Sequence, residues 1–167
     1  MIGAQAELSI LSGISESVRL LFRRPRRGQF AALCYRLPQG QITPEILVLT
    51  SRDTGRWVIP KGWPMGAKPG YEVAKQEAME EAGVLGEAER ESLGTFCYKK
   101  NISDDFAVAC EVQVYALRVT SALDEFKEKG KRKIEWVPPA IAESRVREPQ
   151  LKRLIHRFAE RFDSAAA

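Results

Sequence analysis

Continuous and alternating apolar runs divide the chain into expected strands. Residues 46–49 are four apolar residues in a row within the segment 45–51, a pattern typical of a strand buried on both faces. Other strand-like runs lie at 30–37, 57–59, 93–98, 106–119 and 134–137. We expect the run at 134–137 to form an edge strand. Periodicity leaves residues 17–22 open between a short strand and a helical turn.

Helical spacing marks three further segments. Residues 71–82 predict a helix that ends at Gly83, and its alanines recur every fourth residue, so we expect close packing against a sheet. Pro138 and Pro139 open a short helix. Residues 150–162 predict a terminal amphipathic helix. Its inward-facing residues are Leu151, Leu154, Ile155 and Phe158.

The order of these elements predicts helices flanking a mixed sheet, which places the fold in the α/β (α+β) class. We expect a single domain over residues 17–167, preceded by a flexible N-terminal segment over residues 1–16. The chain has 167 residues, enough to bury a substantial hydrophobic core. We find no internal repeat.

Composition narrows the class of protein. The chain is 44% hydrophobic and 29% charged, as in ordinary soluble domains, and its net charge of +4 favours anionic ligands. The three cysteines, Cys34, Cys97 and Cys110, stand singly in apolar runs, so we expect buried reduced thiols rather than disulfides or a zinc site. No run reaches the length of a membrane span, and the first residues lack a secretory pattern. We expect a cytoplasmic protein.

The most informative chemistry lies on the helix expected at 71–82. Glu77, Glu80 and Glu81 project from one side of it, with no lysine or arginine among them. Such like charges repel one another unless something neutralises them, and Mg²⁺ prefers carboxylate oxygens together with substrate phosphates. The alternative is a solvated acidic face. The surroundings of the cluster decide between the two.

The stretch from Gly62 to Val84 resembles the Nudix box, a pattern of glycine, five residues, glutamate, seven residues, then Arg-Glu-apolar-x-Glu-Glu-x-Gly-apolar. The matching residues are Gly62, Glu77, Ala78, Glu80, Glu81, Gly83 and Val84. Lys68 stands where the family has its first glutamate, and Gln76 stands where it has arginine. In the family these two side chains support the loop and the catalytic glutamates. We interpret the double change as altered scaffolding around an intact acidic site.

The resemblance covers about residues 29–142. The segments SRDTGRWVIPKG before the box and KRKIEW after it resemble the branch that cleaves diphosphoinositol polyphosphates and diadenosine polyphosphates. The resemblance implies the Nudix-type α/β/α sandwich, with a mixed β-sheet between helices. It also implies hydrolysis of a phosphoanhydride bond with Mg²⁺, or Mn²⁺, as the cofactor.

By the same resemblance, Glu77, Glu80 and Glu81 are catalytic residues and metal ligands, and the carbonyl of Gly62 or a neighbour is a further ligand. The general base is left open. One of the box glutamates can serve, and Glu111 is an outside candidate whose alternative is an exposed strand glutamate.

Fixed cations near the box are candidates for holding substrate phosphates. We predict this role for Arg52, Arg56, Lys61 and Lys68. Lys99 and Lys100 end a strand that could line the same cleft. His156 is expected at the surface or as a cap.

Three functions fit these observations. The first is metal-dependent hydrolysis of a nucleoside or inositol polyphosphate, a small-molecule substrate. The second is a binding module that kept the scaffold and lost the chemistry, as the changes at Lys68 and Gln76 suggest. The third is pyrophosphohydrolysis at RNA 5′ ends. Its support is the basic run Arg23, Arg24, Arg26 and Arg27, which reads equally as a solvated loop. We do not expect nucleic acid or a membrane as a partner, and the oligomeric state is open.

Overall fold

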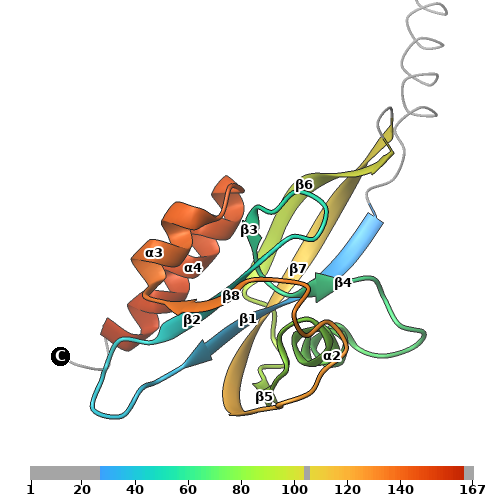
Figure 1. Ribbon diagram of the computed structural model, residues 1–167. Helices are drawn as coiled ribbons and strands as arrows, with labels where there is room; N and C mark the ends of the chain where they lie inside the picture. The colour runs from blue at the N-terminus through green and yellow to red at the C-terminus, as the bar shows by residue number, and fades with distance from the viewer. Residues whose placement is uncertain (1–26, 104–105, 164–167) are drawn as a thin grey trace, which may run out of the picture.

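An eight-stranded mixed sheet forms the centre of the computed structural model, which describes residues 27–103 and 106–163 (Figure 1). The strands are β1 (Arg27–Arg36), β2 (Glu45–Thr50), β3 (Trp57–Val58), β4 (Lys61–Gly62), β5 (Val84–Ala88), β6 (Gly94–Ser103), β7 (Phe106–Ala122) and β8 (Ile134–Val137). The helices are α2 (Gly70–Ala82), α3 (Pro139–Arg145) and α4 (Pro149–Asp163). The predicted segment 17–22 and the arginines 23, 24 and 26 lie outside the described residues.

The parallel pair β1–β7 lies at the middle of the sheet. Its register runs from Arg27 opposite Cys110 to Tyr35 opposite Arg118. The main strand order is β3-β2-β1-β7-β5, and every pairing other than β1–β7 is antiparallel. In addition, β4 pairs with β1, β6 with β7, and β8 with β2. The prediction of a mixed sheet is confirmed.

Helices cover both faces of this sheet. Figure 1 shows α2 on one side and α3 with α4 on the other. Alternate residues of β2 accordingly enter two different cores: Ile46 and Val48 pack in the cluster that contains the buried face of α4, while Leu47 and Leu49 pack in the cluster that contains the alanines of α2. The apolar run of β2 is therefore buried on both faces, as its sequence predicts.

Helix α2 lies close to the sheet because the side chains facing it are small. Ala74 and Ala78 are fully buried, and Ala82 is 7% exposed. The helix begins at Gly70, one residue before the predicted start, and ends at Gly83 in the left-handed conformation with φ of 65°. A side chain at position 83 would collide with the ring of Phe126. The segment 123–133 between β7 and β8 thus packs against the C-terminal end of α2.

Two strands escape the sequence patterns. β4 has only two residues, and β5 carries Gly86 at its middle. A Cβ atom at Gly86 would lie 2.0 Å from the carbonyl oxygen of Arg118, so the glycine permits a close backbone approach where the β5–β7 register shifts. β6 also continues to Ser103, beyond the predicted end at 98. Apart from Ile102, its added residues are polar, and most are exposed, so they lack the alternating apolar signal of a strand.

The remaining predictions have mixed outcomes. All four inward residues predicted for α4 are buried, and β8 and α3 form where expected. The three cysteines form no disulfide with one another, but only Cys34 and Cys110 are buried. Cys97 is half-buried because it lies on the face of β6 opposite the buried Phe96. In the part of the chain that the structure describes, no helix is long and apolar enough to cross a membrane.

Candidate active site

A cleft of about 550 Å³ lies between α2, β4, β6, the turn before β3 and the segment 123–133. This size is typical of small-molecule sites. One part of its lining is acidic and consists of Glu77, Glu80 and Glu81 on α2, here called the acidic group. A second part, here called the basic group, consists of Arg56 just before β3, Lys61 on β4 and Lys100 on β6. Trp63 and Tyr98 add aromatic surface. The predicted clustering of charge around the box helix is therefore found in one cavity.

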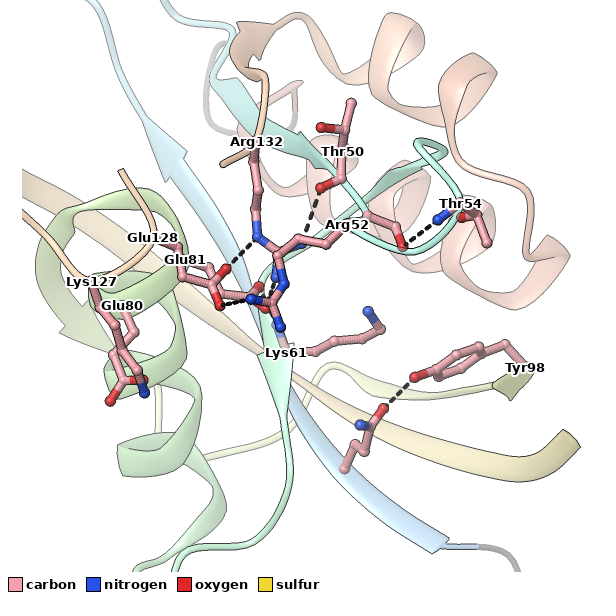
Figure 2. Close-up of polar contacts among 12 residues, drawn as sticks. Thr50, Arg52, Thr54, Lys61, Glu80, Glu81, Tyr98, Lys127, Glu128 and Arg132 are labelled. Atoms are coloured by element: carbon pink, nitrogen blue, oxygen red, sulfur yellow. Dashed lines mark hydrogen bonds and ion pairs between the residues drawn. The ribbon is translucent and has the colours of Figure 1, made fainter. Parts of the chain in front are cut away.

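Glu81 is the most buried member of the acidic group, at 8% exposure. It accepts a hydrogen bond from Nη2 of Arg132 at 2.6 Å and one from the backbone N–H of Lys61 at 3.2 Å (Figure 2). Burial raises the pKa of Glu81, and the nearby guanidinium of Arg132 and ammonium of Lys61 oppose that rise. Arg132 therefore favours the ionised form of this carboxylate.

Arg132 is itself almost fully buried, and its guanidinium joins three segments. Besides Glu81, it donates from Nε to Glu128 at 2.6 Å and from Nη1 to the carbonyl oxygen of Thr50 at 3.0 Å. Arg52 approaches the other oxygen of Glu128 at 3.4 Å. Figure 2 shows Arg132 between Glu81 and Thr50. This network ties α2, β2 and the segment 123–133 together around the acidic group.

Glu80 has different partners. It accepts hydrogen bonds from the side-chain amide of Gln76 at 2.8 Å and from Nζ of Lys127 at 2.5 Å. These two hydrogen bonds lower the pKa of Glu80. Lys127 is 67% exposed, whereas Glu80 is 17% exposed. The Glu80–Lys127 pair therefore lies at the mouth of the cleft, apart from the Arg132 network (Figure 2).

Glu77 has no cation at ion-pair distance among the described residues. Burial, followed by repulsion from Glu81 and Glu80, raises its pKa to about 7. Its carboxylate lies directly against the backbone of Gly62, where a Cβ atom would come within 1.9 Å of Oε1. A side chain at position 62 would therefore displace this carboxylate.

Two members of the basic group lie over the ring of Tyr98, and the third lies over the ring of Trp63. Arg56 lies 5.4 Å and Lys61 5.3 Å from the ring centroid, and Lys100 lies 5.2 Å from the centroid of Trp63. Burial, together with the neighbouring cations, lowers the pKa of Lys61, although Glu81 partly compensates. Within the described residues no acceptor forms a hydrogen bond with Nζ of Lys61. An anion bound here would stabilise the ammonium form.

Comparison with known proteins identifies the architecture. The chain is 28% identical over 117 residues to Nudix hydrolase 12, mitochondrial, of Arabidopsis thaliana, a match that covers 68% of this chain and 58% of that protein. The chain thus spans little more than half the length of this curated relative. The chain is thus similar to Nudix hydrolases both in sequence and in fold. No family model matches the chain.

Solved Nudix structures share the fold. The Ap4A hydrolase binary complex of C. elegans superposes with a TM-score of 0.60 at 15% identity, covering 83% of this chain and 98% of that one. The NUDIX domain of Shewanella oneidensis NrtR complexed with ADP ribose gives 0.57 at 14% identity, with 85% and 97% covered. MutT protein from Methanosarcina mazei Go1 gives 0.58 at 18% identity, with 86% and 97% covered. These likenesses confirm the predicted fold class.

The structure shows how the altered Nudix box is held. Lys68, in place of the family glutamate, donates from Nζ to the Oε1 atom of Gln76 at 2.6 Å. Gln76, in place of the family arginine, passes the contact on to Glu80 through its amide N–H. The two changed positions therefore still contact each other, and a neutral amide links a lysine to Glu80. This arrangement agrees with the interpretation of altered scaffolding.

The donor atoms of the acidic group suit a hard divalent cation, but their present arrangement does not form a metal site. Carboxylates and a backbone carbonyl are the donors that Mg²⁺ and Mn²⁺ prefer. Repulsion from Glu81 and Glu80 adds to burial in raising the pKa of Glu77. In residues 27–103 and 106–163, however, no three acidic, histidine or cysteine side chains converge as a metal site. Lys127 and Arg132 pair with two of the three glutamates, so a cation at Glu80 or Glu81 would share these carboxylates with them.

The predicted site residues are distributed as follows. Arg52, Arg56, Lys61, Gly62 and the three glutamates line the cleft, and so do Lys99 and Lys100. Lys68 does not line it and instead contacts Gln76. Glu111 is exposed on β7 beside Cys97 and lies outside the cleft lining. His156 is 63% exposed beside Glu143, as expected for a surface residue. The catalytic, metal and substrate roles of these residues stay predictions.

Sequence reasoning missed Arg132, Lys127 and Glu128. Arg132 belongs to the KRKIEW segment, which indicated the branch of the family but no contact. Lys127 and Glu128 sit in a run of charged residues typical of a solvated loop. The sequence marks Gly83 as the end of α2, but the packing of the segment 123–133 against it is seen only in the structure.

The raised pKa of Glu77 gives a prediction for the metal-free protein. A folded-state pKa of about 7 against an ordinary 4.5 means that the folded state binds the proton more tightly, so stability falls as pH rises from 4.5 to 7. Glu77→Gln should therefore stabilise the protein at pH 8, and the gain should shrink as pH falls to 5. Urea unfolding in EDTA measures this, with exposed Glu87→Gln as the control. Equal or lower stability of Glu77→Gln at pH 8 contradicts the prediction.

Proposed function

We propose that the protein hydrolyses a phosphoanhydride bond in a polyphosphate of nucleotide type, with Mg²⁺ or Mn²⁺ as the cofactor. The observation that carries the proposal is the division of one cleft into an acidic group and a basic group. Phosphoanhydrides are polyanions, so their hydrolysis needs charge neutralisation and an oriented water molecule. A cleft with carboxylates at one side and fixed cations at the other can supply both.

The basic group binds the phosphates in this proposal. The guanidinium of Arg56 can grip two phosphate oxygens, while Lys61 and Lys100 act as point charges. Burial of Lys61 strengthens its attraction for an anion because less water screens it. Glu77, Glu80 and Glu81, with the carbonyl of Gly62, would hold the metal ion. When bound, that ion lowers the pKa of a water molecule and polarises phosphoryl oxygens.

Substrate class follows from the number of cations. Seven lysine and arginine side chains line the cleft: Arg52, Arg56, Lys61, Lys99, Lys100, Lys127 and Arg132. Because Arg132, Arg52, Arg56 and Lys127 each contact a carboxylate, the cations left for substrate are Lys61, Lys99 and Lys100, together with the unbonded nitrogens of Arg56. This supply suits several phosphates. The C. elegans Ap4A hydrolase shares the fold, and the sequence segments flanking the box resemble the same branch.

We therefore expect dinucleoside polyphosphates with four or more phosphates, or diphosphoinositol polyphosphates, to be cleaved with a higher kcat/KM than nucleoside triphosphates. For the dinucleoside substrates, water should attack a phosphorus remote from one end, which gives a nucleoside triphosphate or longer fragment. A substrate panel with Mg²⁺, followed by product analysis in oxygen-18 water, tests both points. A clear preference for one modified nucleoside triphosphate would contradict the substrate class and leave the hydrolase proposal standing.

One observation favours a second candidate, a binding module without turnover. Both Glu80 and Glu81 already have cationic partners, which neutralise part of the charge that would attract a metal ion. In this case the protein would bind the same polyphosphates without releasing product. Calorimetric binding measured beside phosphate release separates the two functions. Saturable binding with no turnover in Mg²⁺ or Mn²⁺ would establish the binding module.

A further inference from the structure

A buried ion pair joins the cleft to the start of the last helix. Arg56, just before β3, donates from Nη1 to Oε1 of Glu148 at 2.5 Å, and Glu148 precedes the first residue of α4. The side chains are 18% and 7% exposed. The other carboxylate oxygen of Glu148 is buried and accepts no hydrogen bond from any described residue. Glu148 does not line the cleft, whereas Arg56 does.

Stability alone is a weak reason for this pair. Removing two charges from water costs free energy that their attraction often fails to recover, and here one carboxylate oxygen lacks a donor. The pair does fix the orientation of the Arg56 guanidinium. One guanidinium nitrogen is anchored by Glu148, and the guanidinium lies over the ring of Tyr98. Tyr98 is itself held by its hydroxyl, which donates to Gln29 at 2.6 Å. No hydrogen bond within the described residues uses the other nitrogens of Arg56.

We propose that Glu148 is a positioning residue that holds Arg56 in the cleft as a ligand for substrate phosphate. The inference rests on the proposed function, because it takes the ligand to be a polyphosphate. Glu148 touches neither substrate nor the reacting atoms, and it acts through Arg56. Anchoring from the far side leaves the remaining N–H groups of the guanidinium directed to a phosphate at no further ordering cost.

The direction of the change in anion affinity distinguishes a positioning role of Glu148 from a purely electrostatic effect of its charge. Glu148→Gln removes a negative charge close to the basic group, so an electrostatic contribution alone would strengthen the binding of an anion. If Glu148 positions Arg56, the same substitution weakens binding, because the guanidinium loses its charged anchor. The two explanations thus predict opposite changes in affinity for one variant.

The test measures KM and kcat for a dinucleoside tetraphosphate in wild type, Glu148→Gln, Arg56→Gln and the double variant. We expect Glu148→Gln to raise KM by about tenfold, the loss expected for one charge-assisted hydrogen bond, with kcat changed by less than about threefold. Arg56→Gln should raise KM at least as much. The double variant should be no worse than Arg56→Gln, because Glu148 has nothing left to position.

Glu135→Gln is the matched control. Glu135 pairs with Arg145 at 2.6 Å, and Arg145 lies 4.6 Å from the centroid of Trp57, so it reproduces an arginine held between a carboxylate and an aromatic ring outside the cleft. Its KM should stay at the wild-type value. Urea unfolding of each variant shows that the folded state persists under assay conditions, and Glu148→Asp supplies a milder change if Glu148→Gln unfolds.

The outcomes distinguish this inference from the proposed function. If wild type cleaves the substrate and Glu148→Gln leaves KM unchanged or lowers it, the positioning role is wrong. The positioning role is also wrong if the rise in KM of the double variant is the sum of the effects of the two single variants. If wild type neither cleaves nor binds any polyphosphate, the proposed function itself fails. Binding without cleavage in wild type keeps the test intact, with the calorimetric dissociation constant in place of KM.

Discussion

Glu80→Gln is expected to lower kcat by about 100-fold or more, the loss typical when charge stabilisation at a reaction centre is removed. Glu80 lines the cleft within the acidic group, and its replacement removes one of the three carboxylates proposed to hold the metal ion. The fold should survive. The partner of Glu80 is Lys127, which is 67% exposed, and pairs of this kind contribute less than about 1 kcal/mol. Steady-state kinetics at saturating Mg²⁺ measures the loss.

Glu72→Gln is the control for this prediction, because Glu72 lies on the same helix, pairs with Lys75 and does not line the cleft. Its turnover should match that of wild type. Calorimetric titration with Mn²⁺ adds a readout independent of activity, and Glu80→Gln should bind Mn²⁺ more weakly. Near-wild-type turnover of Glu80→Gln would remove Glu80 from the catalytic assignment.

Arg132→Met is expected to cost about 3–5 kcal/mol of unfolding free energy, the range for breaking a buried charge network by removing one partner. Arg132 is 8% exposed, and its loss leaves Glu81 and Glu128 without their main cation. It also removes the hydrogen bond to the carbonyl oxygen of Thr50. By the same reasoning Glu81→Gln should be destabilising, because it removes one of the two carboxylates that pair with the buried Arg132. Urea unfolding measures both variants.

Arg145→Met provides the comparison, since the Arg145–Glu135 pair is partly exposed and should cost about 1 kcal/mol or less. The double variant Arg132→Met/Glu81→Gln should recover part of the loss, because one of the stranded charges is then gone. A cost below about 1 kcal/mol for Arg132→Met would show that Glu81 and Glu128 are solvated well enough to need no counterion.

The fold was predictable where the sequence carries a periodic apolar signal. The run in β2, the alanine stripe of α2 and the inward residues of α4 each specify burial directly, and Gly83 ends α2 by its backbone freedom. The strands β4 and β5 were not predictable in this way. Their pairing depends on where β1 and β7 lie, and Gly86 weakens the local strand signal at the point where the tertiary structure requires a glycine.

The sequence predicted which residues gather at the site, but it did not predict which side chains contact one another there. Helical spacing places three glutamates together, and the residues entering the box bring Arg56 and Lys61 to the same cleft. The partners of those residues come from far along the chain: Arg132 for Glu81, Lys127 for Glu80 and Glu148 for Arg56. Charged residues in loops give no sequence signal for such pairing, because most of them are solvated.

The parallel pairing of β1 with β7 has a consequence for how the protein is made. Gln29 pairs with Val112, so the middle of the sheet joins residues 83 positions apart (112 minus 29). Contacts this distant along the chain slow folding, because a long loop must close before the pairing contributes any free energy. On a ribosome, β1, β2 and α2 emerge before the strand that completes their sheet. Until β7 follows, the apolar edge of β1 is open to other chains, which makes the nascent protein a candidate for chaperone binding.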